Sequence, residues 1–359
     1  MKRKLTVLFY VEYPYYFPHF LPISEVFSIH GHRVKYVLSN KQNSQNMETI
    51  AKKHHIDYTF DENILYNREI DIAFFANRFP NISDIHGLTV FLEHGIGSKS
   101  NSFYPFVQDV DIYLTEGIQK YNTIAALYPE EINKLFQVGF SKFDAIVNSK
   151  DEYKSAIFQK YKLDKEKKTI LYAPTFFPSS IEKMADNFPE IFSECNIIVK
   201  AHYLTFERNQ YKKQVVKFNT WGQYDNVVIL PLEEYSIVPF LAISDVMISD
   251  ESSAMFEFAA LNKPVISNRF FKLRWSYYFM PWKLKVRIDT SKDKYRVIFD
   301  NANTYKDMVA LTKDVLNNPN KLEKQRIMFS RDICGVIDGK VSKRIYDVMI
   351  QKIGSDNDI

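Results

Sequence analysis

Residues 246–266 read Val246-Met-Ile-Ser-Asp-Glu-Ser-Ser-Ala-Met-Phe-Glu-Phe-Ala-Ala-Leu-Asn-Lys-Pro-Val-Ile266, which predicts a strand, a polar turn, a helix and a second strand. The run Val246–Ile248 is apolar, as in a buried parallel strand. Ser249–Ser253 offers several N-cap residues, and Pro264 ends the helix that follows. The turn therefore places hydroxyls, free backbone N–H groups and a helix dipole at the carboxyl edge of a sheet, where α/β proteins bind phosphate. An ordinary capped helix would fit the same residues.

The same alternation of strand and helix runs through the whole chain, and it predicts parallel sheets with helices on both faces. Neither half contains the G-x-G-x-x-G pattern of dinucleotide-binding enzymes, which disfavours a redox function. A final helical region is expected from about Tyr305 to Ile353. The expected strands are 5–11, 33–38, 56–60, 70–75, 89–92, 111–114 and 136–139 in the first half, and 169–172, 196–200, 227–230, 246–248, 265–266 and 285–288 in the second.

A chain of 359 residues exceeds the usual size of a single core, so two domains are expected. The charged, helical stretch 148–167 is the best candidate boundary. The fold prediction is α/β, with two Rossmann-like domains that face a cleft and span residues 1–150 and 151–359.

Composition excludes several other classes. Two cysteines, Cys195 and Cys334, are too few for a disulfide framework or a metal cluster, which fits a reducing cytoplasm. No window holds 18 apolar residues, so no transmembrane helix is expected and any membrane contact would be peripheral. The net charge of +4 is too small to indicate nucleic acid. We expect no metal site and no cofactor.

Histidines follow predicted strands in both halves. His94 ends the strand before a glycine-containing turn, where an imidazole with a pKa near neutrality could act as a general base, and Lys99 could balance phosphate charge. Lys200 and His202 lie on the same side of an extended strand end and suit a diphosphate. Thr175 follows another strand and could donate its hydroxyl. Each of these segments could also be a plain turn or a solvated strand end.

Together these motifs resemble the CDP-glycerol glycerophosphotransferase family, whose members build the poly(glycerol phosphate) of teichoic acids and some capsules. The resemblance covers roughly residues 90 to 350. It rests on His94-Gly95 with Lys99, Gly139 to Asp144, Tyr172 to Thr175, Lys200 to His202, Ser249 to Ser253 with Phe256 to Phe258 and Lys263-Pro264, and Asp338-Gly339 through Arg344-Ile345.

The resemblance implies a GT-B fold in which the first domain (1–150) is on the acceptor side and the second (151–359) binds the nucleotide donor, with a C-terminal helix that could cross back. CDP-glycerol or a related CDP-alditol would be the donor, with CMP released. His94 would take the proton from the acceptor hydroxyl, and Asp250 would orient a histidine or cap the helix. His202, Asp250 and His94 are the predicted catalytic residues; Lys99, Thr175, Lys200, Ser252, Ser253, Lys343 and Arg344 are the predicted donor-binding residues.

The chain departs from the family pattern at several positions. Gly97 and Tyr203 stand where prolines are common, Phe176-Phe177 replaces an arginine, Lys142 replaces an arginine and Lys343 replaces a glutamate. These departures leave open the acceptor, a glycan or lipid-linked hydroxyl, and even the transferred group.

Two other functions stay open. A GT-B glycosyltransferase that uses a UDP- or CMP-sugar would need the same fold, and a non-catalytic protein that binds nucleotide sugars or polymers would bind without turnover. Basic and aromatic residues mix in Phe103–Phe106 and Arg269–Lys285, which suits the anionic inner face of the cell membrane. A packed aromatic core with a solvated basic edge would give the same pattern.

Overall fold

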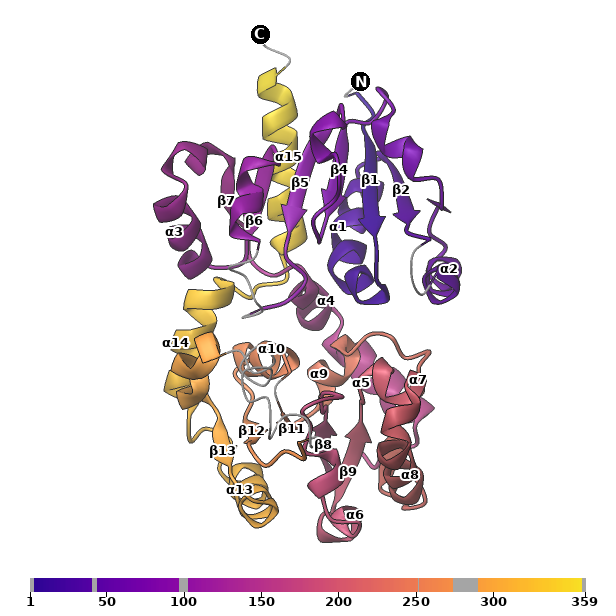
Figure 1. Cartoon of the computed structure of the whole chain (residues 1–359), viewed down its shortest axis with the longest axis vertical. Helices are drawn as coiled ribbons and strands as arrows, with labels where there is room; N and C mark the ends of the chain where they lie inside the picture. The colour runs from indigo at the N-terminus through magenta and orange to yellow at the C-terminus, as the bar shows by residue number, and fades with distance from the viewer. Residues whose placement is uncertain (1–2, 41–43, 97–102, 251, 274–289, 357–359) are drawn as a thin grey trace. The chain divides into compact units, whose positions relative to one another are not determined.

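The computed structural model describes residues 3–40, 44–96, 103–250, 252–273 and 290–356. It divides the chain into two compact units. The first unit comprises residues 1–148 together with 331–359, and the second comprises residues 149–330. Figure 1 shows the labelled elements of both.

The first unit is built on a seven-stranded sheet whose described pairings are all parallel. The order is β3-β2-β1-β4-β5-β6-β7. Strands β2 and β3 are added on one side of β1 and strands β4 to β7 on the other, so the strand order reverses between β1 and β4. The strands are β1 (Thr6–Val11), β2 (Arg33–Leu38), β3 (Tyr58–Thr59), β4 (Ile72–Phe75), β5 (Leu88–Leu92), β6 (Ile112–Thr115) and β7 (Leu135–Gln137); the helices are η1 (Pro14–Tyr16), α1 (Phe17–Ile29), α2 (Ser44–Lys53), α3 (Ile118–Leu127), α4 (Lys142–Asn148) and α15 (Val341–Asp356).

Aromatic side chains fill much of this core, in a chain that contains 29 phenylalanines and 23 tyrosines. Phe9 on β1 stacks on Phe74 of β4 with ring centroids 4.8 Å apart, and on Tyr36 of β2 at 5.1 Å. Phe20 of α1 closes over the same ring at 5.3 Å. All four side chains are buried, so these rings join α1 to the centre of the sheet.

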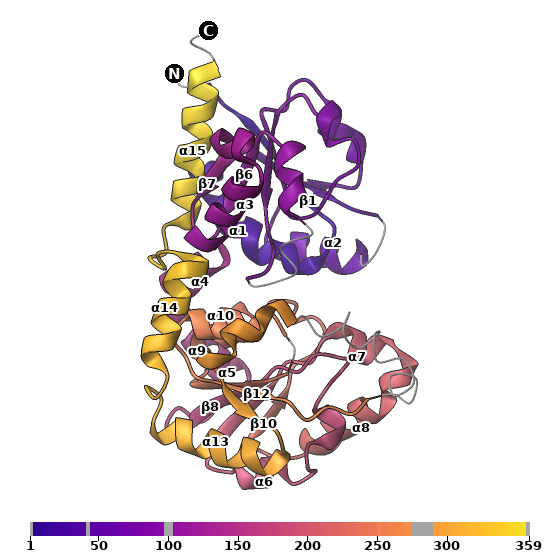
Figure 2. The ribbon, with the colours of Figure 1, turned by 60° about the vertical axis from the view of Figure 1, so that its left-hand side comes forward.

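The C-terminal residues return to the first unit. The buried carboxylate of Asp144, on α4, accepts hydrogen bonds from the backbone N–H groups of Val341 (3.0 Å) and Ser342 (2.6 Å) at the start of α15. Beyond this start α15 lies along α1 (Figure 2). The chain passes from the first unit to the second after Asn148, and residues 331–359 belong with the first unit. The sequence-based expectation was a boundary near residue 150, with the rest of the chain in one domain.

The second unit repeats the same strand order in a six-stranded parallel sheet, β10-β9-β8-β11-β12-β13. Its direction of growth reverses between β8 and β11. The strands are β8 (Lys168–Tyr172), β9 (Cys195–Val199), β10 (Val227–Ile229), β11 (Val246–Ser249), β12 (Val265–Asn268) and β13 (Asp300–Ala302); the helices are α5 (Lys150–Lys160), α6 (Phe188–Ile191), α7 (Tyr203–Glu207), α8 (Lys212–Trp221), α9 (Val238–Ile243), α10 (Ala254–Ala260), α13 (Tyr305–Asn317) and α14 (Glu323–Cys334).

Most predicted strands are found within a few residues of their expected bounds. The strand expected at 285–288 falls outside the described residues, and the sheet ends instead with β13. The helical region from about Tyr305 to Ile353 is three helices: α13, α14 and α15.

The two aromatic segments considered for membrane contact fare differently. In the first, Phe106 is in the core and Phe103 and Tyr104 pack against it, which favours the packed-core reading of Phe103–Phe106. Most of the second segment, 274–285, lies outside the described residues. No helix among the described residues is long and apolar enough to cross a membrane.

Candidate functional site

In each unit, polar residues gather where the strand order reverses. Open α/β sheets bind ligands at this point, because the loops that leave the two neighbouring strands turn to opposite faces and open a crevice. The order reverses between β8 and β11 in the second unit and between β1 and β4 in the first, and the region beyond the carboxyl ends of each pair is called the crevice of that unit. The quoted stretch 246–266 forms β11, α10 and the start of β12, as predicted.

Asp250 is the buried anchor of the crevice in the second unit. Its carboxylate accepts hydrogen bonds from the backbone N–H groups of Thr175 (2.5 Å) and Ser180 (2.8 Å). It also accepts from the hydroxyls of Ser179 and Ser180, both at 3.0 Å. Burial raises the pKa of Asp250 to about 6, against the effect of these donors. The role predicted for Asp250 is therefore corrected: its described contacts neither orient a histidine nor cap α10, but hold the connection after β8 in place.

Thr175 and the two serines lie around this anchor. Thr175 is tied through its backbone to Asp250, and its side chain is partly exposed. Ser252 and Ser253 are partly exposed just before α10, and the Ser252 hydroxyl accepts a hydrogen bond from Ala254 N at 3.3 Å. Their predicted phosphate contacts remain predictions.

One ring nitrogen of His202 forms a structural hydrogen bond with the backbone. His202 is the N-cap of α7, and its Nδ1 accepts a hydrogen bond from the backbone N–H of Leu204 at 3.2 Å. Burial, with help from Lys200 and Arg208, lowers its pKa to about 4. The ring is therefore neutral near neutral pH, and because Nδ1 accepts, its single proton sits on Nε2. His202 is prepared to donate a hydrogen bond, not to take a proton.

Lys200 follows β9, two residues before His202. Burial lowers the pKa of its ammonium to about 8. Within the described part of the chain its Nζ has no carboxylate or carbonyl partner, which leaves the group available to an anion. A partly buried cation with no carboxylate among its described neighbours is costly for the protein alone, as at sites that bind anions.

Two residues of this unit that depart from the family pattern, Phe176 and Tyr203, both contact the ring of His202. Phe176 and Tyr203 lie 4.8 Å and 4.7 Å from the His202 ring, measured between centroids. Arg208 lies 5.9 Å from the Phe176 ring centroid. A guanidinium therefore lies beside position 176, where the family pattern has an arginine.

His94, in the first unit, has the opposite tautomer. Its Nδ1 lies 2.8 Å from the carbonyl oxygen of Ala76, and since a carbonyl only accepts, Nδ1 carries the proton. Burial lowers the pKa of His94, so the ring is neutral and its Nε2 keeps a free lone pair. This is the state that a general base needs. Lys99, predicted to assist, lies outside the described residues.

Residues near His94 were not found by sequence reasoning. The rings of Tyr15 and Tyr16 lie 5.4 Å and 5.0 Å from the imidazole. At the same edge of the sheet, the amide of Asn77 donates to Glu12 at 2.7 Å. The signal available in the sequence is the run Tyr13-Pro-Tyr-Tyr16 directly after the first predicted strand, where the topology places ligand-binding loops.

Lys343 and Arg344 each form an ion pair with a nearby aspartate. Arg344 pairs with Asp338 at 2.8 Å and donates to the carbonyl of Val138 at 2.8 Å. Lys343 is exposed and pairs with Asp347 one turn along α15. Arg344 therefore stabilises the turn before α15 and does not have the free guanidinium that the predicted phosphate contact would use. Lys343 has an acidic partner on its own helix.

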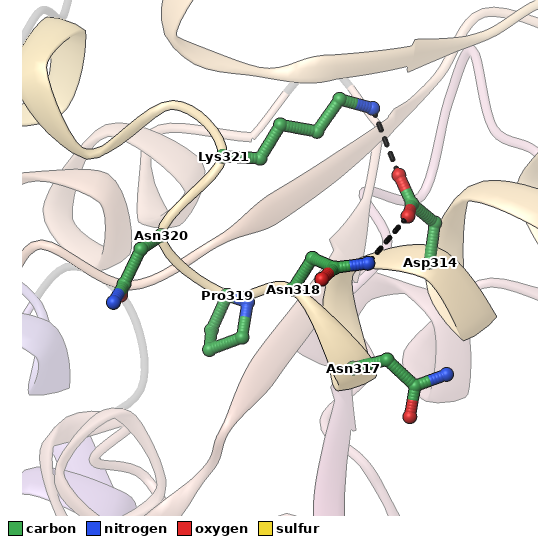
Figure 3. A pocket seen from close by; sticks show the side chains of 6 residues that line it. All are labelled: Asp314, Asn317, Asn318, Pro319, Asn320 and Lys321. Carbon is green, nitrogen blue, oxygen red and sulfur yellow. Dashed lines mark hydrogen bonds and ion pairs between the residues drawn. The ribbon is translucent and has the colours of Figure 1, made fainter.

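One further hollow lies in the second unit, at the connection from α13 to α14 (Figure 3). Its volume is about 550 Å³, and Asp314 inside it pairs with Lys321 at 2.9 Å and accepts from Asn318 at 3.0 Å. None of the candidate residues lines this hollow. Among the described residues, no three histidine, cysteine or acidic side chains lie close enough to hold a metal ion.

A family model described as CDP-glycerol:poly(glycerophosphate) glycerophosphotransferase matches residues 97–351, well over half of the chain. The chain belongs to this family. The matched range includes His202 and Asp250 of this glycerophosphotransferase-family protein but begins after His94.

Two curated relatives of the glycerophosphotransferase-family chain show how it compares in length. The teichoic acid glycerol-phosphate primase of Bacillus spizizenii is 34% identical over 124 residues, which are 34% of this chain and 30% of the primase. The teichoic acid glycerol-phosphate transferase of Staphylococcus aureus is 24% identical over 235 residues, which are 61% of this chain and 55% of the transferase. The chain thus spans less than two thirds of the length of these relatives.

Solved structures agree on the fold. The wall teichoic acid polymerase TagF has a TM-score of 0.66 at 16% identity, covering 99% of this chain and 90% of that chain. A co-structure of Staphylococcus aureus MnaA with UDP has a TM-score of 0.65 at 13% identity, covering 98% and 97%. At these identities the likeness concerns the fold alone, and with the two sheets described above it confirms the predicted GT-B class.

Proposed function

We propose that this glycerophosphotransferase-family chain transfers glycerol phosphate, or a related alditol phosphate, from a CDP-linked donor to an acceptor hydroxyl and releases CMP. One observation carries the proposal: two neutral histidines at the carboxyl edges of the two sheets have opposite tautomers. His94 presents a lone pair on Nε2, and His202 presents an N–H on Nε2. Phosphoryl transfer to a hydroxyl needs one group of each kind.

The donor diphosphate would bind in the crevice of the second unit. His202 Nε2–H and the Lys200 ammonium would contact its oxygens, with Thr175, Ser252 and Ser253 offering hydroxyls and backbone N–H groups. Burial of Lys200 strengthens its attraction for an anion, because the medium around it screens charge less than water does. Asp250 would act as a positioning residue, since its carboxylate holds Thr175 in place and would repel an anionic ligand.

The reaction would be an in-line displacement at the phosphorus that bears the glycerol. The acceptor oxygen forms the new P–O bond, its proton passes to Nε2 of His94, and the bond to the bridging oxygen breaks so that CMP leaves with the electron pair. His202 and Lys200 would stabilise the charge that develops on CMP. Such a reaction depends mainly on positioning and charge stabilisation.

Asparagine substitutions separate the chemistry of each histidine from its structural hydrogen bond. In His94→Asn, the side-chain amide N–H can replace Nδ1–H as donor to Ala76, but no base remains. We expect an unchanged melting temperature, unchanged CDP-glycerol binding and a loss of CMP release on the order of 10²–10⁴-fold. Wild-type turnover in His94→Asn would reject the base role.

In His202→Asn, the amide oxygen can replace Nδ1 as the N-cap acceptor, because asparagine is a good N-cap, but the Nε2 donor is lost. We expect a stable protein whose donor affinity falls about tenfold or more, as for a lost charge-assisted hydrogen bond. Isothermal titration with CDP-glycerol measures this, and an unchanged dissociation constant would remove His202 from the donor site.

A donor panel tests the reaction class and the transferred group. CDP-glycerol, CDP-ribitol and UDP-N-acetylhexosamine are compared by nucleotide release and by mass analysis of the product. Release of CMP with addition of an alditol phosphate supports the proposal. Release of UDP with addition of a sugar would make the chain a glycosyltransferase, and binding without turnover of any donor would make it a binding protein.

We also propose a glycan or lipid-linked acceptor and, through residues 269–285, contact with an anionic membrane surface. Basic and aromatic residues alternate in this stretch, as in segments that bind at the interface of anionic bilayers. Co-sedimentation with anionic liposomes at low and high salt tests the contact. Absence of binding at low salt would reject it.

A further inference from the structure

We propose that the crevice of the first unit binds an uncharged sugar ring at the end of the acceptor, with the ring against Tyr13 and Tyr15 and its hydroxyls on Glu12 and Asn77. This rests on the proposed function and names the class of acceptor: a saccharide end, in preference to the phosphate-rich end of a growing poly(alditol phosphate) chain.

The topology brings these side chains to one place. Strands β1, β4 and β5 are parallel neighbours, so the residues that follow them share one edge of the sheet. Glu12 and Tyr13 directly follow β1, Asn77 comes shortly after β4, and His94 comes shortly after β5. The hydrogen bond from His94 to Ala76 joins the last two connections. The candidate base and the four proposed sugar-binding residues therefore surround the crevice that the reversal of strand order opens.

An aromatic platform stands beside the candidate base. The rings of Tyr13 and Tyr15 are stacked, with centroids 5.2 Å apart and planes within 7° of each other. Tyr16 behind them is fully buried, but Tyr15 is 39% exposed although its ring also contacts His94. A large aromatic side chain held at the surface next to a reactive group is typical of a ligand site, where apolar faces are combined with a few polar groups. The apolar C–H face of a sugar ring fits such a surface.

The polar groups at this edge suit hydroxyls. Asn77 donates to one carboxylate oxygen of Glu12 at 2.7 Å, which holds both side chains in place. The side-chain amide oxygen of Asn77 accepts from Arg78 N at 2.9 Å, and the side chains of Glu12 and Asn77 are partly exposed. A carboxylate has about four acceptor positions, so Glu12 retains capacity for the O–H donors of a sugar.

The charge of Glu12 selects against a phosphate. Burial and then the negative charge of Glu12 raise the pKa of Tyr13, and Glu12 acts in the same direction on Tyr16, so the field of the carboxylate reaches the platform. The nearby Lys120 does not offset this field, because it is paired with Glu93 at 3.0 Å and with Glu116 at 2.6 Å. A phosphodiester placed on these rings would meet like charge, whereas a neutral sugar would not.

Binding of sugars without any reaction tests the site directly. The probes are methyl glycosides of glucose and N-acetylglucosamine, with glycerol 3-phosphate for comparison, and saturation-transfer NMR on the full chain reports contact. We expect signals from the glycosides with the wild type and with Tyr15→Phe, which keeps the aromatic face, and a several-fold weaker signal with Tyr15→Ala. Tyr128→Ala, at the end of α3, is the matched control and should bind as the wild type does. No glycoside signal with the wild type, or equal signals with Tyr15→Ala, would overturn the proposal.

Charge selectivity has its own variant. Glu12→Gln keeps the shape and the bond to Asn77 but removes the charge, and we expect it to bind glycerol 3-phosphate several-fold more tightly than the wild type, with glycoside binding weakened. Unchanged selectivity would overturn the role of Glu12. These readouts need no donor, so failure of CDP-glycerol turnover and failure of sugar binding are told apart. Where turnover is present, Tyr15→Ala should raise the KM for a saccharide acceptor on the order of 10-fold.

Discussion

Lys200 holds an ammonium where burial opposes its charge, and its pKa falls to about 8. An anionic donor binds the charged form more tightly, so affinity should weaken as the pH rises through this value. Near pH 8, Lys200 is charged in half of the molecules. We therefore expect CDP-glycerol binding to weaken about tenfold from about pH 7 to about pH 9. Isothermal titration across this range measures the effect.

Three substitutions make the Lys200 prediction specific. Lys200→Arg keeps its charge at all these pH values and should flatten the profile, and Lys200→Met should bind weakly throughout. Lys213→Met, an exposed lysine on α8, is the control and should follow the wild type. A Lys200→Met variant with wild-type affinity would show that the ammonium does not contact the donor.

His202 couples protonation to stability in the acidic range. Its pKa is about 4 in the folded chain, below the ordinary 6.5, so the unfolded chain binds more protons between these values. The stabilisation is fully present above about pH 6.5 and is lost as the pH falls towards 4. A pKa lowered from 6.5 to about 4 corresponds to about 3 kcal/mol. Urea unfolding of the wild type and His202→Asn across this range tests it: the free energy of unfolding of the wild type should fall relative to that of the variant as the pH falls, and parallel curves would contradict the assignment.

At the scale of single residues, sequence patterns predicted which residues lie at the edge of a sheet better than they predicted the contacts of those residues. Lys200 and His202 follow one strand end as predicted, because spacing after an apolar run locates the edge of a sheet. The partner of each histidine nitrogen comes from outside that pattern: Ala76 is 18 positions from His94. Asp250 was assigned to a histidine or a helix N-terminus, yet its donors lie 70 to 75 positions away on the connection after β8. Such long-range contacts leave no local signal.

At the scale of elements, the side chain of Lys263 caps the C-terminal end of helix α9, although Lys263 lies well beyond that helix in the sequence. Its ammonium donates to the carbonyl oxygens of Leu241 and Ala242, both at 2.7 Å, and of Ser244 at 2.8 Å. The last carbonyls of a helix have no partners within the helix, and a cation there also complements the dipole. We expect Lys263→Met to lower the free energy of unfolding by about 2–3 kcal/mol.

Urea unfolding measures this loss, with Lys306→Met on the exposed surface of α13 as the control. Donor affinity of the folded Lys263→Met protein should stay as in the wild type, because its described contacts are with α9 and not with the crevice. A variant as stable as the control would show that water replaces the ammonium without cost.

Strand predictability followed burial. Strands β8, β9 and β11 are apolar runs buried on both faces and were predicted within a residue or two. β13 was missed because its three residues, Asp300-Asn-Ala302, have no apolar run, and it exists through pairing with β12 at the edge of the sheet. Edge pairing is a tertiary effect that propensity does not record.

At the scale of the molecule, two sheets of the same strand order place their reversal points at corresponding positions, and this much was predictable from repeated strand-helix alternation. The predicted domain bounds placed residues 331–359 in the second domain, although the family resemblance implied a C-terminal helix that could cross back. The return of these residues to the first unit depends on Asp144, almost 200 positions from Val341, and on the turn closed by Arg344 and Asp338. Gly139 lies in this contact at φ +106°, where an added Cβ would meet the Val341 side chain at 2.8 Å.

The fold of the first unit should therefore depend on its C-terminal helix. Asp144 satisfies two buried N–H groups at the start of α15, and Tyr346 further along packs on His30, directly after α1, with ring centroids 4.2 Å apart. Asp144→Ala leaves both N–H groups without an acceptor, which should lower the free energy of unfolding of this unit by about 2–4 kcal/mol. Asp151→Ala, an exposed acid in the first turn of α5, is the matched control and should have little effect.

Hydrogen exchange read by mass spectrometry locates the effect of Asp144→Ala. Protection should fall in α15 and also in α1 and the strands beside it, because one cooperative unit includes both ends of the chain, while residues 149–330 should exchange as in the wild type. Loss confined to α15 would mean that the helix is an appendage to a unit that is stable without it. Equal loss in both units would mean that they unfold together, so the same measurement decides between a tail, a part of one domain and a single cooperative molecule.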